Sequence, residues 1–207
     1  MQTREERLQK IHSYFVDWVK PVYQYRTMDT MSIYHTNREK IVHSLLASLD
    51  AATEAAKPMS GLYRNQKIAF IQFSYLLSAT LTKELQLRID LYDTRHYGDL
   101  TDTKSYWDYQ ELFPYIDDDM KQLRIELDKR FLRITNYEIL DMRMYYHVGV
   151  FALIEEVLKE IVTSVPFFEA LGELYQSEIS VLYGGYLDQA RVIASINRRQ
   201  ANGLLSN

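Results

Sequence analysis

The sequence predicts an all-α protein, a helical bundle of about six long helices in a single domain over residues 1–200. Glycine and proline, which interrupt regular structure, number only 7 and 4 in 207 residues. Apolar side chains recur at intervals of three and four along most of the chain, as on one side of an amphipathic helix. Strand signals are nearly absent. Long helices joined by short loops pack as antiparallel neighbours, so a bundle follows.

Three of the predicted helices lie in the N-terminal half of the chain. The first runs from about residue 3 to 26, and Pro21 is expected to kink or end it because proline lacks a backbone donor. The second runs from about residue 29 to 57 and is followed by a proline stop signal. The third runs from about residue 60 to 97, with Gly98 as its C-terminal cap.

The C-terminal half supplies three more helices after an irregular segment. Residues 98–115 are the least periodic part of the chain and are expected to form a loop with a short helix. Helical spacing resumes at about residues 116–131, 137–164 and 167–199. The tail, residues 201–207, is expected to fray because chain ends hold few contacts.

Composition indicates a cytoplasmic protein and narrows the function classes. The net charge of −4 does not favour binding to a phosphate backbone, so no nucleic-acid partner is expected. The absence of cysteine excludes disulfides and thiolate metal sites. The charged N-terminus MQTREERLQK does not resemble a secretory signal. No apolar run reaches the ~18 residues of a membrane span, so no membrane contact is expected.

Ionisable side chains on the apolar sides of the predicted helices are the strongest chemical signal. Burying a charge without a partner is too costly to persist, so each such group needs a counter-ion or contact with water. Six residues fall in this class: Arg38, Arg88, His96, Arg143, His147 and Glu178. Arginine stems also lie along apolar surface while their charged ends reach water, so a purely structural role stays open.

If these groups meet in one pocket, they form a site for an anionic ligand. Glu178 is the expected counter-ion, because a guanidinium grips a carboxylate with two hydrogen bonds. The cationic surplus would hold the ligand, with Tyr92 among the phenols that complete its hydrogen bonds. His147 and Glu178 are the candidate catalytic groups, and Arg143 with His147 leaves an RNA-directed role open.

The sequence contains too few suitably spaced ligand residues for a metal-binding or cofactor-binding motif. Asp93 and His96 match once the carboxylate–histidine spacing of a dinuclear helical site, but no second pair exists, so no metal or cofactor is predicted. Glu155 is interpreted as part of a solvated face, and Arg191 as a cation near a helix end. The pair Gly184 and Gly185 inside a predicted helix indicates a kink or close packing.

The aromatic run within residues 98–115 supplies the candidate partner-binding residues Tyr106, Trp107 and Tyr109. Exposed tryptophan and tyrosine provide large contact areas at interfaces, although the same residues can fold back and cap the core. The leading functional hypothesis is therefore a cytoplasmic adaptor or regulatory protein that acts by protein–protein contact, self-association included. The alternative is an enzyme or small-molecule sensor with the Arg/His/Glu pocket.

Overall fold

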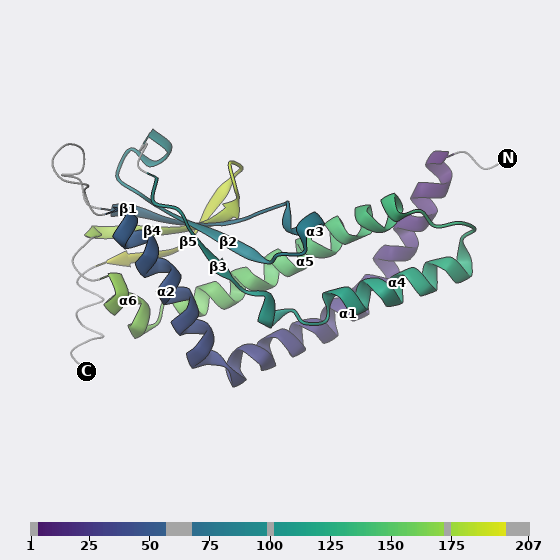
Figure 1. Ribbon diagram of the computed structural model, residues 1–207, viewed down its shortest axis with the longest axis horizontal. Coiled ribbons are helices and arrows are strands. Elements are labelled where there is room, and N and C mark those ends of the chain that lie inside the picture. The colour runs from purple at the N-terminus through teal and green to yellow at the C-terminus, as the bar shows by residue number, and fades with distance from the viewer. Residues whose placement is uncertain (1–3, 57–67, 99–101, 172–174, 198–207) are drawn as a thin grey trace.

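The computed structural model describes residues 4–56, 68–98, 102–171 and 175–197. Within these ranges the chain forms six α-helices and a five-stranded mixed sheet, which makes it an α/β fold. The predicted all-α helical bundle is therefore wrong. The sheet lies at one end of the molecule, and long helices continue beyond it (Figure 1). The predicted C-terminal tail falls outside the described residues.

Four of the six predicted helices exist, with shifted bounds. The helices are α1 (Arg4–Thr36), α2 (Arg38–Ala56), α3 (Ala79–Thr82), α4 (Ile116–Arg130), α5 (Asn136–Val162) and α6 (Val165–Leu171). Pro21 lies on the exposed side of α1 and does not end it, because buried residues on both sides of the proline hold the helix to the core. α5 begins with a capping box, in which Thr135 and Glu138 satisfy each other's backbone N–H groups.

The other two predicted helices are wrong, and the sheet takes their place. The strands are β1 (Ile68–Tyr75), β2 (Gln86–Tyr92), β3 (Ser105–Asp108), β4 (Tyr175–Gly185) and β5 (Ala190–Asn197). Two short 3-10 helices, η1 (His96–Gly98) and η2 (Gln110–Leu112), flank β3. The segment predicted as irregular therefore contributes an edge strand. Gly184, predicted to lie in a helix, lies at the β4–β5 turn, where an added Cβ would collide with the backbone of Ala190.

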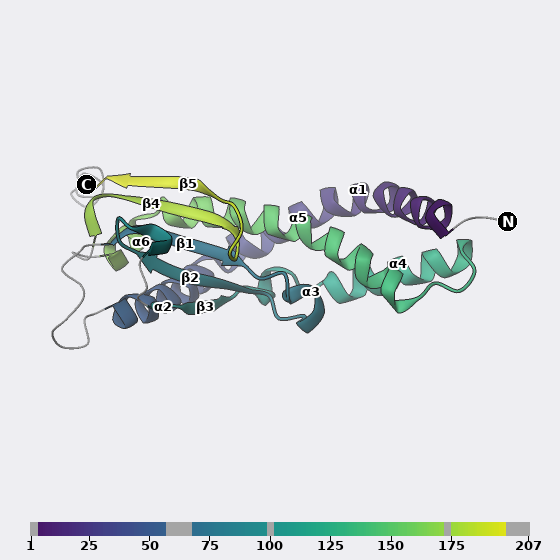
Figure 2. The ribbon, with the colours of Figure 1, turned by 90° about the horizontal axis from the view of Figure 1, so that it is seen from above.

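The strand order is β3-β2-β1-β4-β5, and only β1 and β4 run parallel among the described pairs. The connection that makes them parallel contains α4, α5 and α6. Figures 1 and 2 show α2, α5 and α6 on one face of the sheet, with the other face turned away from these helices.

Residues at alternate strand positions divide between the two faces of the sheet. Ile71 and Phe73 of β1 are buried on the helical face, and Tyr75 in the same register stacks on Phe151 of α5. Gln72 and Ser74 point to the opposite face and are also buried. The core therefore lies between the sheet and α2, α5 and α6, and polar side chains occupy the other face.

Beyond the sheet, a buried carboxylate joins α1, α4 and α5. Asp119 of α4 accepts hydrogen bonds from Arg26 Nη2 at 2.7 Å and Nε at 3.0 Å, both from α1. The hydroxyl of Tyr146 on α5 donates to the same carboxylate at 2.6 Å. Burial, together with this hydrogen bond, raises the pKa of Tyr146, so the phenol keeps its proton. The network fixes both the spacing and the rotation of the three helices.

Replacement of Asp119 should therefore destabilise the fold strongly. Asp119→Ala leaves the half-buried Arg26 with Asp29 as its remaining described partner and removes the acceptor of the buried Tyr146 hydroxyl, and an unsatisfied buried donor typically costs about 1–3 kcal/mol. Urea unfolding should show this loss. The matched control is Asp118→Ala on the same helix, because the exposed Asp118 forms a surface ion pair with Lys121. Equal and small losses in the two variants would contradict the role given to Asp119.

Candidate functional site

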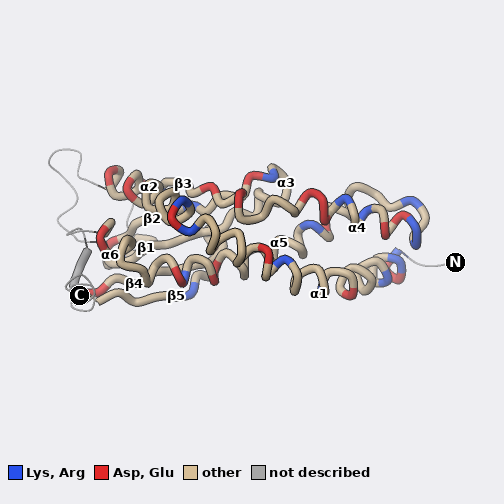
Figure 3. The backbone as a smooth tube through the Cα atoms, turned by 90° about the horizontal axis from the view of Figure 1, so that it is seen from below, with Lys and Arg blue, Asp and Glu red and all other residues tan. Residues whose placement is uncertain are grey.

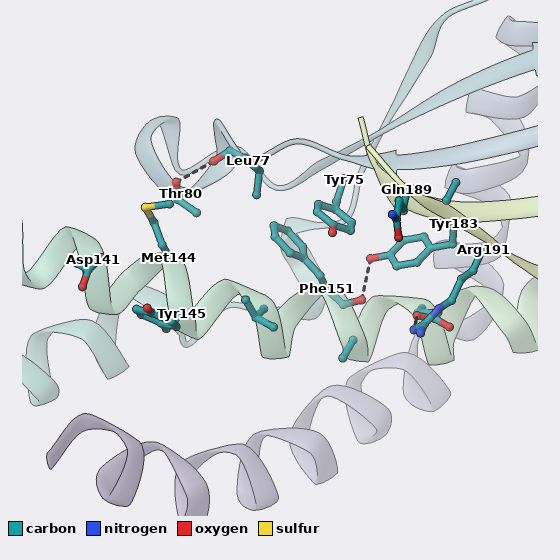
Figure 4. A pocket seen from close by; sticks show the side chains of 15 residues that line it. Tyr75, Leu77, Thr80, Asp141, Met144, Tyr145, Phe151, Tyr183, Gln189 and Arg191 are labelled. Atoms are coloured by element: carbon teal, nitrogen blue, oxygen red, sulfur yellow. Dashed lines mark hydrogen bonds and ion pairs between the residues drawn. The ribbon is translucent and has the colours of Figure 1, made fainter. Parts of the chain in front are cut away.

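A groove of about 700 Å³ runs along α5 on its exposed side. α5 contributes residues spaced three or four apart, which share one helix face. The opposite wall comes from the end of β1, from α3 and from the β4–β5 hairpin (Figure 4). The lining residues on α5 are Asp141, Met144, Tyr145, Val148, Phe151, Ala152 and Glu155. A volume of this size falls within the range of ordinary ligand pockets.

Three aromatic side chains form the middle of the groove (Figure 4). The rings of Tyr75 and Phe151 are stacked, with centroids 4.1 Å apart and planes 12° from parallel. The hydroxyl of Tyr183 donates to the backbone carbonyl of Phe151 at 2.7 Å. Burial raises the pKa of Tyr183 well above its ordinary value, so this phenol stays neutral. The floor is therefore rigid, apolar and uncharged.

An ion-pair cluster closes one end of the groove. Glu155 is only 2% exposed, and its carboxylate accepts from Lys159 at 3.0 Å and from Arg191 of β5. Burial opposes ionisation, but the hydrogen bonds from Arg191 and Lys159 hold the pKa of Glu155 below its ordinary value. The interpretation of Glu155 as part of a solvated face is wrong, because β5 lies against this side of α5.

The other end of the groove combines a carboxylate with exposed apolar side chains. Asp141 forms no ion pair with any residue that the structure describes. Leu77, Met144 and Val148 line this half of the groove and are exposed to solvent, although burial of apolar side chains is favourable. Contiguous exposed apolar surface of this kind marks binding sites more often than ordinary protein surface.

Arg143 and His147 lie on another side of α5 and are buried, as the helical spacing predicted. Arg143 pairs with Asp117 of α4. His147 Nδ1 lies 2.8 Å from the carbonyl oxygen of Arg143, and a carbonyl only accepts, so this nitrogen donates. Burial lowers the pKa of His147, so the ring is neutral at pH 7. The ion pair between Arg143 and Asp117 thus holds α4 and α5 together.

The sheet brings four other predicted site residues to its polar face. Arg88 donates two hydrogen bonds of 2.7 Å to Asp90, and its guanidinium lies 4.4 Å from the ring centroid of Tyr186. Tyr106 of β3 is the register partner of Arg88. The rings of Tyr92 and His96 contact each other, with centroids 5.1 Å apart. Asp90 neutralises the arginine, so this face presents no unbalanced cation at Arg88.

A hydrogen-bonded contact also holds His96 to this face. His96 Nε2 lies 3.3 Å from Oε1 of Gln72, and burial lowers the pKa of His96. Gln72 also donates to Tyr97 at 2.9 Å. These hydrogen bonds attach η1 to the sheet. They engage His96, which the sequence analysis expected to bind a ligand, with Gln72 of the same chain.

The remaining predicted residues are dispersed. Arg38 is exposed at the first position of α2, and Glu178 is exposed on β4 opposite Asn197. The expected pairing of Glu178 with the inward arginines is wrong, because Asp90 and Asp117 take that place. Trp107 and Tyr109 are 1% and 0% exposed and fill the core, whereas Tyr106 is exposed. Of the three aromatic candidates, only Tyr106 is accessible to a partner.

The sequence analysis missed the residues on the far wall of the groove. Tyr75, Leu77 and Arg191 were assigned to helices, so their position opposite α5 was not expected. The available signal was on α5 itself, where Val148, Ala152 and Glu155 continue one helical line from Met144.

Neither the described residues nor comparison with known proteins indicates a metal site, a membrane span or a protein family. Among the described residues, no three His, Asp or Glu side chains gather as metal ligands would. No helix in the described ranges combines the length and apolar character needed to span a membrane. Lys/Arg and Asp/Glu residues both occur along the whole length of the molecule (Figure 3).

Comparison with protein-family models, curated proteins and solved structures found no match to this chain.

Replacement of Glu155 should change how stability depends on pH. Because the folded-state pKa of Glu155 is depressed, its contribution is present above the unfolded pKa, about 4.3, and is lost as pH falls through the folded pKa. Glu155→Gln should therefore lower the free energy of unfolding clearly at about pH 7 and little at about pH 3. The control is Glu156→Gln, whose carboxylate is exposed. Urea unfolding that shows a pH-independent difference for Glu155→Gln would contradict the assignment.

Proposed function

We propose that this chain is a cytoplasmic binding protein that acts through protein–protein contact, with the groove along α5 as its binding surface. The supporting observation is the set of exposed apolar side chains in the groove, Leu77, Met144 and Val148. These groups have a rigid aromatic floor behind them, and burying them against a partner is favourable by about 25 cal/mol per Å² of apolar area.

The dimensions of the surface favour a helix as the bound element. From Asp141 to Glu155 the helix rises 14 residues, about 20 Å at 1.5 Å per residue. A partner helix of about four turns would cover this strip, with its apolar side chains between α5 and the opposite wall. The aromatic floor does not need to rearrange for such binding.

The alternative of an anionic-ligand enzyme or sensor has weaker support. Arg88 and Arg143, the arginines expected to hold the ligand, each have a carboxylate partner within this chain. A ligand that displaced Asp90 or Asp117 would have to compensate for a lost ion pair.

Photo-crosslinking from the groove tests the proposal directly. Val148 is replaced by p-benzoylphenylalanine, which reacts with any protein within contact distance, in cells that express the chain. The matched control carries the same group at Met28 of α1, since the two native side chains are 64% and 69% exposed. We expect a defined covalent adduct from position 148 that is absent or weak from position 28.

The adduct is identified by mass spectrometry, and binding of the purified partner is measured with the wild type and with Val148→Arg. Loss of binding in the variant, with an unchanged melting temperature, supports the groove as the surface. Equal crosslinking from both positions, or no adduct from position 148, would contradict the proposed function.

A further inference from the structure

The groove residues of α5 extend equally far on both sides of Val148, although Glu155 at one end is buried and paired with Arg191. Asp141 and Glu155 lie seven residues before and after Val148, and both line the groove. A twofold axis through Val148 and perpendicular to α5 would therefore lay the N-terminal half of one strip against the C-terminal half of another. Homodimers use this kind of self-complementary surface, in which one patch contacts its own copy.

The charges at the two ends of the strip are complementary in this arrangement. Asp141 is a carboxylate without an ion pair to any described residue. At the other end, the side chain of Arg191 is 71% exposed and uses one nitrogen to bind Glu155. A guanidinium has five N–H donors, so Arg191 retains donors for a second carboxylate. Each end lies about 10 Å from the axis, so Asp141 would meet the partner's Arg191 twice per dimer.

The apolar parts of the groove match in the same way. Val148, at the axis, has a short side chain that allows two helices to approach at the usual 8–10 Å. Met144 would lie opposite the partner's Ala152, which places a long side chain against a small one. Leu77 on the α3 side would face the partner's β4–β5 hairpin, where Leu187 is exposed. The exposed apolar groups of each half thus meet apolar groups of the other half.

We propose that the occupant of the groove is a second copy of this chain, bound antiparallel along α5 about a twofold axis at Val148. This inference rests on the proposed function, because it names the partner of the same surface. Charge complementarity between Asp141 and the exposed Arg191 selects this occupant over a helix of another protein.

Sedimentation velocity of the full chain over a range of concentrations tests the dimer. We expect the wild type to associate to a dimer, and Val148→Arg and Val148→Glu to remain monomeric at the same concentrations. Each variant places two like charges together at the axis, which is strongly unfavourable. An equimolar mixture of the two variants should restore a dimer, because the introduced charges are then opposite. Met28→Arg is the control and should dimerise as the wild type does.

The register of the dimer is tested separately with Asp141→Arg. This change sets two cations at each end of the interface and should raise the dissociation constant by about tenfold. Far-UV circular dichroism checks that every variant is folded, and the substituted side chains all lie at the surface of α5 or α1.

Three results would overturn the dimer: a monomeric wild type at all concentrations, a dimer that survives Val148→Arg, or a mixture that stays monomeric. The crosslinking experiment separates this failure from that of the proposed function. An adduct to a different protein at position 148 would refute the second copy and retain the binding surface, whereas no adduct would refute both.

Discussion

The hydrogen bonds that Asp119 accepts from Arg26 and Tyr146 determine which side of α5 faces solvent. They hold α1 and α4 against one side of the helix, while the sheet covers another through Phe151 and Tyr183. With two sides covered, the line through Met144, Val148 and Ala152 stays exposed along α5. Because a buried carboxylate with three hydrogen bonds tolerates little displacement, the rotation of α5 is fixed. The groove is a consequence of that constraint.

The polar groups that hold the helices and the sheet together differ from those that line the groove. Arg88, Arg143 and His147 have partners within the chain and use their hydrogen bonds to join neighbouring elements. The groove instead presents apolar side chains and, among its described lining residues, two charged groups with unused hydrogen-bonding capacity, Asp141 and Arg191. The proposed contact with another protein uses these apolar side chains and charged groups.

The sequence predicted α4 and α5 well, α1 and α2 with bounds about ten residues off, and the sheet not at all. α4 and α5 are long and strongly periodic, and their bounds differ from the prediction by at most two residues. In the third predicted helix, Leu85, Ile89 and Tyr92 fit a helical line, although the alternation within β2 fits a strand equally well. The neighbouring strand β1, part of the same predicted helix, pairs with both β2 and β4. The pair of Ile71 with Val181 joins residues so distant along the chain that no local pattern reports it. The groove depends on this sheet, so its far wall could not be predicted.

The central claim is that a second copy of the chain covers the groove along α5. Radical footprinting of methionine tests it most directly, because the method needs no substitution and both reporter residues are native. Met144 lies in the groove and Met28 lies on α1 away from it, and both are exposed. Oxidation of each residue is measured by mass spectrometry as the protein concentration is raised. The account predicts that oxidation of Met144 slows as the groove is covered, while that of Met28 does not change. A rate for Met144 that is independent of concentration would contradict it.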